Sequence, residues 1–269
     1  MIGLFLGNRN LPKLIIKSLN KKKIKYFIID LTSKNIFKKN KNSYFINIGK
    51  FGKILNLIKE KKCKNVIFAG NIDKPKISQL KLDLKGVYYI PRIIKASKKG
   101  DAAILKELIK ILSENKVKVL KLNKFNPELT LKKGTYTKIK PSIMDKKEVK
   151  LGISVLNKSN SYDHVQALVV RNKKVIAIEK SSGTHAMLSS IKKTKNKNGF
   201  LIKLPKKNQD LRADLPTIGF ETIKNCKRIG LKGIILKSEK NIVLDKTEII
   251  NFSNKNKMIL DIIWKKFLF

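Results

Sequence analysis

Residues 2–19, IGLFLGNRNLPKLIIKSL, contain the pattern that decides the fold of the first half of the chain. The apolar run at 2–6 ends at Gly7 and predicts a short buried strand. A polar loop follows, and Pro12 suits the first turn of a helix. The apolar residues of that helix recur at helical spacing: Leu14, Ile15 and Leu19. The stretch therefore predicts a strand, a tight loop and an amphipathic helix.

The same alternation continues to residue 122. Further strands are predicted at 24–31, 65–69 and 117–122, with helices at 51–62 and from Gly100-Asp101 onward. Short apolar strands that alternate with amphipathic helices imply parallel pairing through right-handed crossovers. We therefore predict a Rossmann-like parallel-sheet domain over residues 1–130.

The second half of the chain begins with a change in composition. Residues 123–150 are polar and turn-rich, which places a boundary near 130. The elements predicted beyond it are strands at 165–171 and 174–179 joined by an Asn172-Lys173 turn, helices at 184–193 and 217–228, strands at 200–204 and 232–236, and a strand or docking helix at 258–269. We predict a mixed α/β domain over 131–269, so the fold class is α/β with two domains.

The 269 residues carry 62 basic and 19 acidic side chains, a formal net charge of +43. Such a charge suggests nucleic acid or an anionic membrane as a partner. Only five of the basic residues are arginines, and the lysines are dispersed, so we favour compositional bias over a dedicated polyanion site. Two distant cysteines argue against disulfides and structural zinc, and no apolar run approaches the roughly 18 residues of a spanning helix. These features predict a cytoplasmic protein.

Against this lysine-rich background, three long lysine-free stretches in the second half of the chain are candidate functional segments: 159–170, 181–191 and 208–223. In the last one, Asp210, Arg212 and Asp214 occupy alternate positions. In extended backbone they would share one side, so the carboxylates could hold a divalent cation and the guanidinium a phosphate. The open alternative is that Asp214 caps the 217–228 helix, with Arg212 as its ion-pair partner.

Glycines mark three further candidate sites. Gly183-Thr184 opens a predicted helix, where backbone N–H groups could bind phosphate or Thr184 could act as an ordinary N-cap. Gly7 and Gly70 follow predicted parallel strands, whose carboxyl ends bind ligands in open α/β sheets. The two histidines, His164 and His185, lack a zinc-ligand partner at helical spacing.

Taken in chain order, these segments resemble one family. The segments that carry the resemblance are GNRNLP at 7–12, FAGNIDKP at 68–75, GD at 100–101, AIE at 177–179 with GTHAML at 183–188, and QDLRADLPTIG at 209–219. The family is LpxI, the UDP-2,3-diacylglucosamine pyrophosphatases of lipid A biosynthesis. The last motif is the most specific, and the resemblance spans nearly the whole chain.

The resemblance implies a two-domain enzyme that holds a lipid nucleotide between its halves. It implies Mg²⁺-dependent hydrolysis of UDP-2,3-diacylglucosamine, by attack of water on the β-phosphorus, to UMP and 2,3-diacylglucosamine 1-phosphate (lipid X). The essential aspartate would be Asp214, with Asp210 as the rival, and both would bind the metal together with Glu179. The expected substrate-binding residues are Gly7, Asn8, Leu11, Pro12, Gly70, Gln166, Gly183, Thr184, Lys203, Gln209 and Arg212.

Two departures from the family pattern concern the site. His185 stands where the family has aspartate, and Val165 stands where it has glycine, in a stretch that begins at Asp163. Mg²⁺ prefers oxygen ligands, so His185 would replace a ligating aspartate only imperfectly. A cationic surface would favour the anionic inner leaflet, where the lipid substrate resides, so the protein is expected there as a peripheral protein, with a homodimer as an open alternative to a monomer.

Two other function classes remain as alternatives. A non-catalytic lipid-nucleotide carrier of the same fold is motivated by the changes at 165 and 185. A basic nucleic-acid-binding protein is motivated by the net charge alone, and the sequence contains no signature of a specific nucleic-acid-binding motif.

Overall fold

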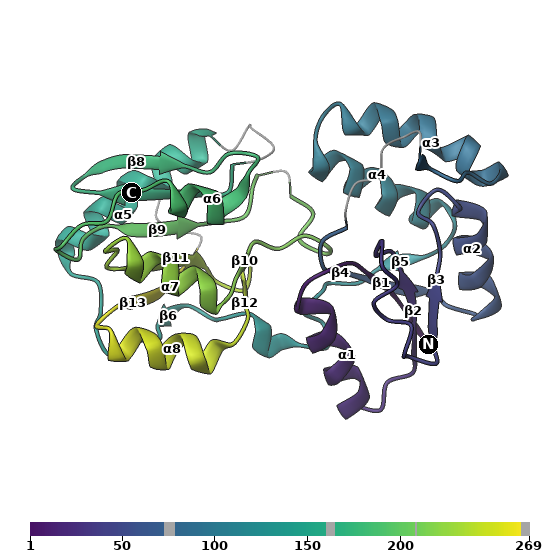
Figure 1. The fold of residues 1–269 in the computed structure, drawn as a ribbon, viewed down its shortest axis with the longest axis horizontal. Coiled ribbons are helices and arrows are strands. Elements are labelled where there is room, and N and C mark those ends of the chain that lie inside the picture. The colour runs from purple at the N-terminus through teal and green to yellow at the C-terminus, as the bar shows by residue number, and fades with distance from the viewer. Residues whose placement is uncertain (73–78, 160–164, 208, 265–269) are drawn as a thin grey trace. The chain divides into compact units, whose positions relative to one another are not determined.

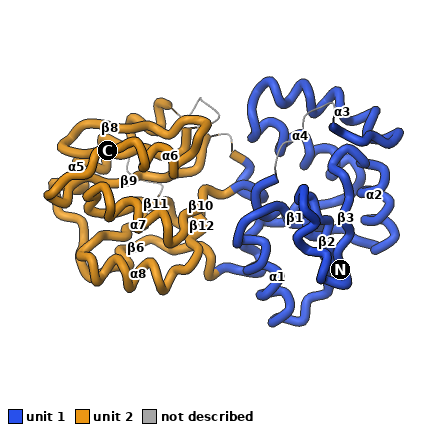
Figure 2. Tube along the Cα trace, viewed as in Figure 1, with its two compact units in different colours: residues 1–127, 210–214 blue, residues 128–209, 215–269 orange. Residues whose placement is uncertain are grey.

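The computed structural model describes residues 1–72, 79–159, 165–207 and 209–264. The chain forms two compact units, coloured separately in Figure 2. Unit 1 comprises residues 1–127 and 210–214, and unit 2 comprises 128–209 and 215–269. The QDLRADLPTIG motif, assigned above to the second domain, is therefore divided: its central residues 210–214 group with unit 1.

Unit 1 is built on a five-stranded, wholly parallel sheet with the strand order β3-β2-β1-β4-β5. Its strands are β1 (Ile2–Leu6), β2 (Tyr26–Asp30), β3 (Ser43–Phe45), β4 (Asn65–Ala69) and β5 (Lys118–Val119). From β1 the chain continues to β2 and β3 on one side of the sheet, and β4 and β5 lie on the other side. The topological switch point therefore lies between β1 and β4. This sheet confirms the predicted Rossmann-like architecture.

Four helices surround this sheet: α1 (Leu11–Lys21), α2 (Phe51–Glu60), α3 (Leu84–Ser97) and α4 (Asp101–Glu114). One face of the sheet, with Phe27, Ile29 and Phe68, forms a core with Ile54 of α2 and Ile111 of α4. The helix α3 packs outside this layer, against α2 and α4 (Figure 1). Neither β3 nor α3 was predicted: β3 is only three residues long, and Pro91 inside α3 interrupts the helical pattern.

Unit 2 contains a six-stranded mixed sheet in the order β6-β13-β11-β9-β7-β8. Its strands are β6 (Gly134–Thr135), β7 (Ala167–Arg171), β8 (Lys174–Ile178), β9 (Phe200–Lys203), β11 (Gly233–Lys237) and β13 (Ile259–Ile263). The strands β9, β11 and β13 run parallel, and the remaining pairs are antiparallel. The predicted hairpin of β7 and β8 is present, and Asn172 and Lys173 both have positive φ, as its two-residue turn requires.

Helices cover both faces of this sheet (Figure 1): α5 (Ile143–Ser159), α6 (Gly183–Ser189), α7 (Phe220–Arg228) and α8 (Lys246–Lys255). Residues of α5 pack with Leu168 and Phe200, whereas α6, α7 and α8 pack with Val169 and Leu201 on the opposite face. Alternating residues of the same strands thus supply two separate cores. A short parallel pair, β10 (Thr217–Ile218) with β12 (Ile242–Val243), and a 3₁₀ turn, η2 (Pro127–Leu129), complete the described elements. The two units together confirm the predicted α/β class.

Three predicted elements need correction. The stretch 123–150, interpreted as turn-rich, contains the start of α5. The helix predicted at 217–228 begins only at Phe220, because Thr217–Ile218 pairs with β12 as a strand. The helix predicted at 184–193 spans Gly183–Ser189. Of the segment at 258–269, the part that the structure describes contains β13 in the sheet.

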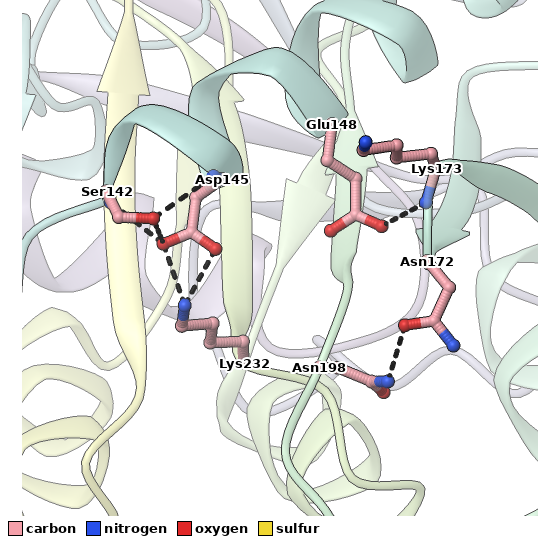
Figure 3. A network of polar contacts seen from close by, with 7 residues as sticks. All are labelled: Ser142, Asp145, Glu148, Asn172, Lys173, Asn198 and Lys232. Carbon is pink, nitrogen blue, oxygen red and sulfur yellow. Dashed lines mark hydrogen bonds and ion pairs between the residues drawn. The ribbon is translucent and has the colours of Figure 1, made fainter.

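Polar side chains that were interpreted as part of a loop make the contacts that fix the beginning of α5 (Figure 3). Ser142 and Asp145 exchange hydrogen bonds between side chain and backbone, which is a capping box. The Nζ of Lys232 contacts both carboxylate oxygens of Asp145, at 2.7 and 2.8 Å. Burial opposes ionisation of Asp145, but Lys232 and Ser142 outweigh it and lower the pKa of this carboxyl. A spacing of Ser-x-x-Asp before Val149 and Ile153 could have predicted this helix.

Candidate functional site

In unit 1, the loops that follow β1 and β4 are joined at the switch point of the sheet. The backbones of Asn8 and Asn71 form a two-way bridge, with N–H···O distances of 2.7 and 3.2 Å. A Cβ on Gly7 would lie 2.2 Å from the carbonyl oxygen of Asn71, and Gly70 has a φ of +88°. Both positions therefore require glycine, and the paired loops form the edge where open α/β sheets bind ligands.

The side chains of this loop divide into two groups. Leu11 and Pro12 are buried in the first turn of α1. Asn8 is half-buried, and Arg9 and Asn10 are exposed. Arg9 was not among the predicted site residues, although it is one of only five arginines and lies within the loop. Residues 73–75 of the second glycine motif lie outside the described residues.

The segment from Asp210 to Asp214 forms a turn and not the extended backbone in which its charged residues would share one side. The backbone N–H of Asp214 donates to the carbonyl of Asp210, at 2.9 Å, and that of Ala213 donates to the same oxygen. The carbonyl of Arg212 accepts from the N–H of Leu122, at 2.8 Å, and Ala213 packs against the unit 1 core. These contacts explain why the turn groups with unit 1.

Within this turn, Arg212 pairs with Asp210. Its Nε and Nη2 donate to the two carboxylate oxygens at 3.0 and 2.7 Å, a bidentate contact, and its backbone N–H adds a third bond. The guanidinium lowers the pKa of Asp210, more than partial burial raises it, and Asp210 in turn raises the pKa of Arg212. The Arg212 side chain is 46% exposed, so its guanidinium remains accessible to a ligand.

The alternative role for Asp214, as the cap of the following helix, is wrong. The helix α7 begins at Phe220, and its N-cap is Gly219. The proposed ion-pair partner of Asp214, Arg212, pairs with Asp210. The structure therefore leaves Asp214 as a half-buried carboxylate beside the Asp210–Arg212 pair, without a capping function.

In unit 2, a second cluster lies where β7 separates β8 from β9. Ala167, the first residue of β7, pairs with Lys203 of β9, and its carbonyl accepts from the N–H of Glu179, just after β8. This register brings Glu179 and Lys203 together although they are far apart in sequence. Their side chains are 3% and 5% exposed, and Nζ lies 3.6 Å from Oε1.

Thr184 completes this cluster. Its hydroxyl donates to Oε1 of Glu179 and accepts from Nζ of Lys203, each at 2.5 Å. The other oxygen of Glu179 accepts from the backbone N–H of Gln166, at 3.2 Å. We call Glu179, Thr184 and Lys203 the buried triad. Because the hydroxyl of Thr184 is used here and Ser182 is the N-cap of α6, the alternative that Thr184 caps this helix is wrong.

Two other predicted residues, Gln166 and Gln209, belong to the same unit. Gln209 is buried and accepts from the N–H of Lys206, at 2.9 Å. The Oε1 atom of Gln166 is buried and has no hydrogen-bond partner within the described part of the chain. Asn241, which sequence reasoning missed, donates to the carbonyl of Lys203 and accepts from the N–H of Lys237. No local pattern marks Asn241, because its partner lies on a neighbouring strand.

The two positions that depart from the family pattern lie in different surroundings. His185 is exposed, and its Nδ1 lies 3.3 Å from the side-chain nitrogen of Asn225. Val165 is buried in the core beneath α5. Asp163 and His164 lie outside the described residues. Gly183, with a φ of +85°, begins α6, whose seven residues make it a short helix.

The three predicted metal ligands differ in how well they fit Mg²⁺. Glu179 does not fit, since it is buried and both its oxygens accept hydrogen bonds from protein donors. Asp210 and Asp214 lie on one turn, and Mg²⁺ is commonly held by one or two carboxylates together with water and substrate phosphates. Over the residues that the structure describes, no group of three or more His, Cys, Asp or Glu side chains is arranged to hold a metal. Both oxygens of Asp210 also accept from Arg212, so ligation of Mg²⁺ by Asp210 requires part of that pair to open, and the turn fits a substrate-bridged Mg²⁺ only in that case.

Comparison with known proteins covers both units. The LpxI N-terminal domain family matches residues 1–129, and the LpxI C-terminal domain family matches residues 132–261. A relative from Caulobacter vibrioides, named UDP-2,3-diacylglucosamine pyrophosphatase LpxI, is 32% identical over 213 residues, which is 76% of each chain. Among the described residues, no helix has both the length and the apolar character to span a membrane. With both of its halves matched in order, this chain belongs to the LpxI family.

Proposed function

We propose that this chain hydrolyses the pyrophosphate bond of UDP-2,3-diacylglucosamine in lipid A biosynthesis, giving UMP and 2,3-diacylglucosamine 1-phosphate. The observation that carries the proposal is family membership over both units, with a relative named for this activity. The turn at 210–214 supports it, because it presents two carboxylates and an accessible guanidinium, the groups that pyrophosphate hydrolysis needs.

In the proposed reaction, a water oxygen forms a bond to the β-phosphorus and the bond to the bridging oxygen breaks, so UMP leaves. Asp214, which the family resemblance makes the essential aspartate and which is half-buried on this turn, would orient the water and accept its proton. Mg²⁺, held by Asp210 and Asp214, would neutralise the charge of the pyrophosphate when bound.

Arg212 and Lys203 have complementary roles toward phosphate oxygens. Arg212 is exposed enough to grip a phosphate with one edge of its guanidinium while Asp210 holds the other. Lys203 is a fixed positive charge, because Glu179 and Thr184 both contact it. The glycine loops after β1 and β4, with Asn8 and Arg9, would face the nucleotide or its phosphates. Gln166, Gln209 and Gly183 remain predicted substrate contacts in unit 2.

The decisive experiment is release of UMP from UDP-2,3-diacylglucosamine, with and without a chelator of divalent cations. We expect turnover that the chelator abolishes and Mg²⁺ restores. Asp214→Ala should lower kcat by about 10²–10⁴-fold, the usual contribution of a positioned acid or base. The matched control is Glu248→Ala, which removes an exposed carboxylate from the first turn of α8.

Other outcomes would point to the alternatives. Full activity of Asp214→Ala would remove this residue from the chemistry and favour Asp210. Binding of the lipid nucleotide without turnover under any divalent metal would support a carrier. Tight, steeply salt-dependent binding to duplex DNA or RNA would support the nucleic-acid alternative. Peripheral association with the cytoplasmic membrane, and a homodimer, remain predictions for vesicle binding and sedimentation to test.

A further inference from the structure

The helix α3 in unit 1 is apolar on two sides. One side packs inward: Tyr89 is buried and stacks at a tilt on Phe51 of α2, and Arg92 pairs with Glu107 and Glu114 of α4. The other side is exposed in the part of the chain that the structure describes. Its large apolar residues, with the preceding Leu82, are strongly exposed: Leu84 at 91%, Tyr88 at 70%, Val87 at 60% and Leu82 at 40%.

These residues form one surface, which we call the α3 patch: Leu82, Leu84, Val87 and Tyr88. Leu84, Val87 and Tyr88 follow the i, i+3, i+4 spacing of a single helix face. A groove of about 820 Å³ adjoins the patch, and it is lined by Leu84 together with Phe45, which is 52% exposed. Single exposed apolar residues are ordinary on protein surfaces, but a contiguous set marks an interaction site.

The charge around the patch is almost entirely positive. Exposed lysines precede, interrupt and follow it: Lys81, Lys85, Lys95, Lys98 and Lys99. The carboxylate of Asp83 accepts hydrogen bonds from the backbone N–H groups of Gly52, Lys53 and Gly86. Burial raises the pKa of this carboxyl, but the hydrogen bonds outweigh burial and lower it. Glu60 is the other acid that lines the groove. The partner of this surface must therefore be apolar and anionic at once.

We propose that the α3 patch is a membrane-docking element that inserts into the surface of an anionic phospholipid bilayer. A helix with an exposed apolar face flanked by lysines lies in the interface plane, with the apolar side chains at the acyl boundary and the lysines at the headgroups. Each lysine near an anionic leaflet contributes about 1 kcal/mol of attraction. The proposal rests on the proposed function in one respect: a substrate with two acyl chains resides in such a bilayer.

A second copy of the chain is a poorer occupant. In a two-fold dimer the same patch would face itself, so both sets of lysines would meet, and each copy carries a net charge of +43. A nucleic acid would match the lysines but leave the apolar side chains without a partner. The bilayer satisfies both features of the surface.

The test is co-sedimentation of the full chain with vesicles of phosphatidylglycerol and phosphatidylethanolamine. The variant Leu84→Asp/Val87→Asp should bind at least about tenfold more weakly than the parent, a loss of about 1.4 kcal/mol. The matched control is Ile143→Asp/Met144→Asp at the start of α5, where the two apolar side chains are 74% and 55% exposed. This control should bind within about twofold of the parent, because it introduces the same two charges outside the α3 patch.

The aspartate variant could also bind weakly because it folds poorly, so a second measurement tests whether the patch itself enters the bilayer. With Trp264, the single tryptophan of the chain, replaced in Trp264→Phe/Tyr88→Trp, brominated lipids should quench the new fluorophore. Equal vesicle binding by both aspartate pairs, no quenching, or concentration-dependent dimerisation abolished by Leu84→Asp/Val87→Asp would each overturn the proposal.

The same variants separate this proposal from the proposed function. A short-chain, water-soluble form of the substrate, assayed without vesicles, should be hydrolysed equally by the parent and by Leu84→Asp/Val87→Asp. Vesicle binding that depends on the α3 patch in a chain without turnover would leave the docking element standing and refute the pyrophosphatase. Loss of soluble turnover in the folded variant would instead assign the patch to the catalytic machinery and overturn docking.

Discussion

Two carboxylate–cation pairs, Asp210 with Arg212 and Glu179 with Lys203, join residues of the predicted site, and they differ in almost every physical respect. The first lies within a single turn of unit 1, with a bidentate contact and an arginine that is 46% exposed. The second lies inside the sheet of unit 2, where both side chains are at most 5% exposed. An exposed pair contributes little to stability, whereas a buried pair must be complete to be tolerated.

Because the two pairs differ in solvent exposure, their cations differ in how readily they can leave their carboxylate partners. Arg212 can exchange part of its contact with Asp210 for a phosphate, since solvent already reaches the guanidinium. Lys203 cannot leave Glu179 without leaving a buried carboxylate uncompensated. The contacts of Glu179 thus hold Lys203 in place and occupy both oxygens that metal ligation would need.

The largest effect is expected when the buried pair is broken. Lys203→Met should lower the free energy of unfolding by about 3–5 kcal/mol, because the Glu179 carboxylate is then left desolvated without its cation. Urea denaturation at pH 7 measures the change. The double variant Glu179→Gln/Lys203→Met should be more stable than the single variant, because it removes the uncompensated charge. Additive costs in the double variant would show that the two residues do not interact.

A smaller effect is expected from the hydroxyl between them. Thr184→Val keeps the shape of the side chain but removes a donor to Glu179 and an acceptor for Lys203. Hydrogen bonds to charged groups contribute about 1.5–3 kcal/mol, and Thr184 is only half-buried, so we expect a loss of about 1–2 kcal/mol in unfolding free energy. Thr184→Ser, which keeps the hydroxyl, is the control. An unfolding free energy of Thr184→Val equal to that of the parent would show that the hydroxyl contributes nothing, and a loss confined to Thr184→Ser would assign the contribution to the methyl group.

Sequence patterns predicted the sheet of unit 1 well because its strands and helices follow one another locally. The apolar runs 2–6 and 65–69 match β1 and β4 residue for residue. The helix α3 escaped prediction because Pro91 interrupts its pattern, and α5 escaped because its capping residues were taken for a polar linker. Local signals were present in α5, at Ser142 and Asp145, but were outweighed by composition.

The candidate site was predictable in its members but not in its contacts. The alternation of Asp210, Arg212 and Asp214 suggested extended backbone, but the carbonyl of Asp210 accepts from the two residues that follow Arg212 and closes a turn. The pairing of Glu179 with Lys203 depends on the register of both with Ala167, and no sequence spacing encodes a non-local register. Motifs therefore identified the residues, and only the fold assigned their partners.

The smallest effect is expected at the exposed pair. Arg212→Met should change the free energy of unfolding at pH 7 by less than about 1 kcal/mol, because solvent screens the pair. The sign of its pH dependence follows from the lowered pKa of Asp210. Above the ordinary carboxyl pKa, the ionised Asp210 stabilises the fold through Arg212. As pH falls through the lowered value, the carboxylate is protonated and this contribution is lost.

The difference in urea midpoint between the parent and Arg212→Met should therefore be present at pH 7 and be lost as the pH falls through the lowered pKa of Asp210. Lys224→Met, which breaks the exposed pair with Glu221 on α7, is a matched control without the bidentate geometry. If Arg212→Met costs as much as Lys203→Met, the turn at 210–214 is held by its ion pair and Arg212 is not free to exchange Asp210 for a phosphate. A small cost combined with a large loss of substrate affinity would instead show that Arg212 contributes to ligand binding and adds little to the stability of the fold.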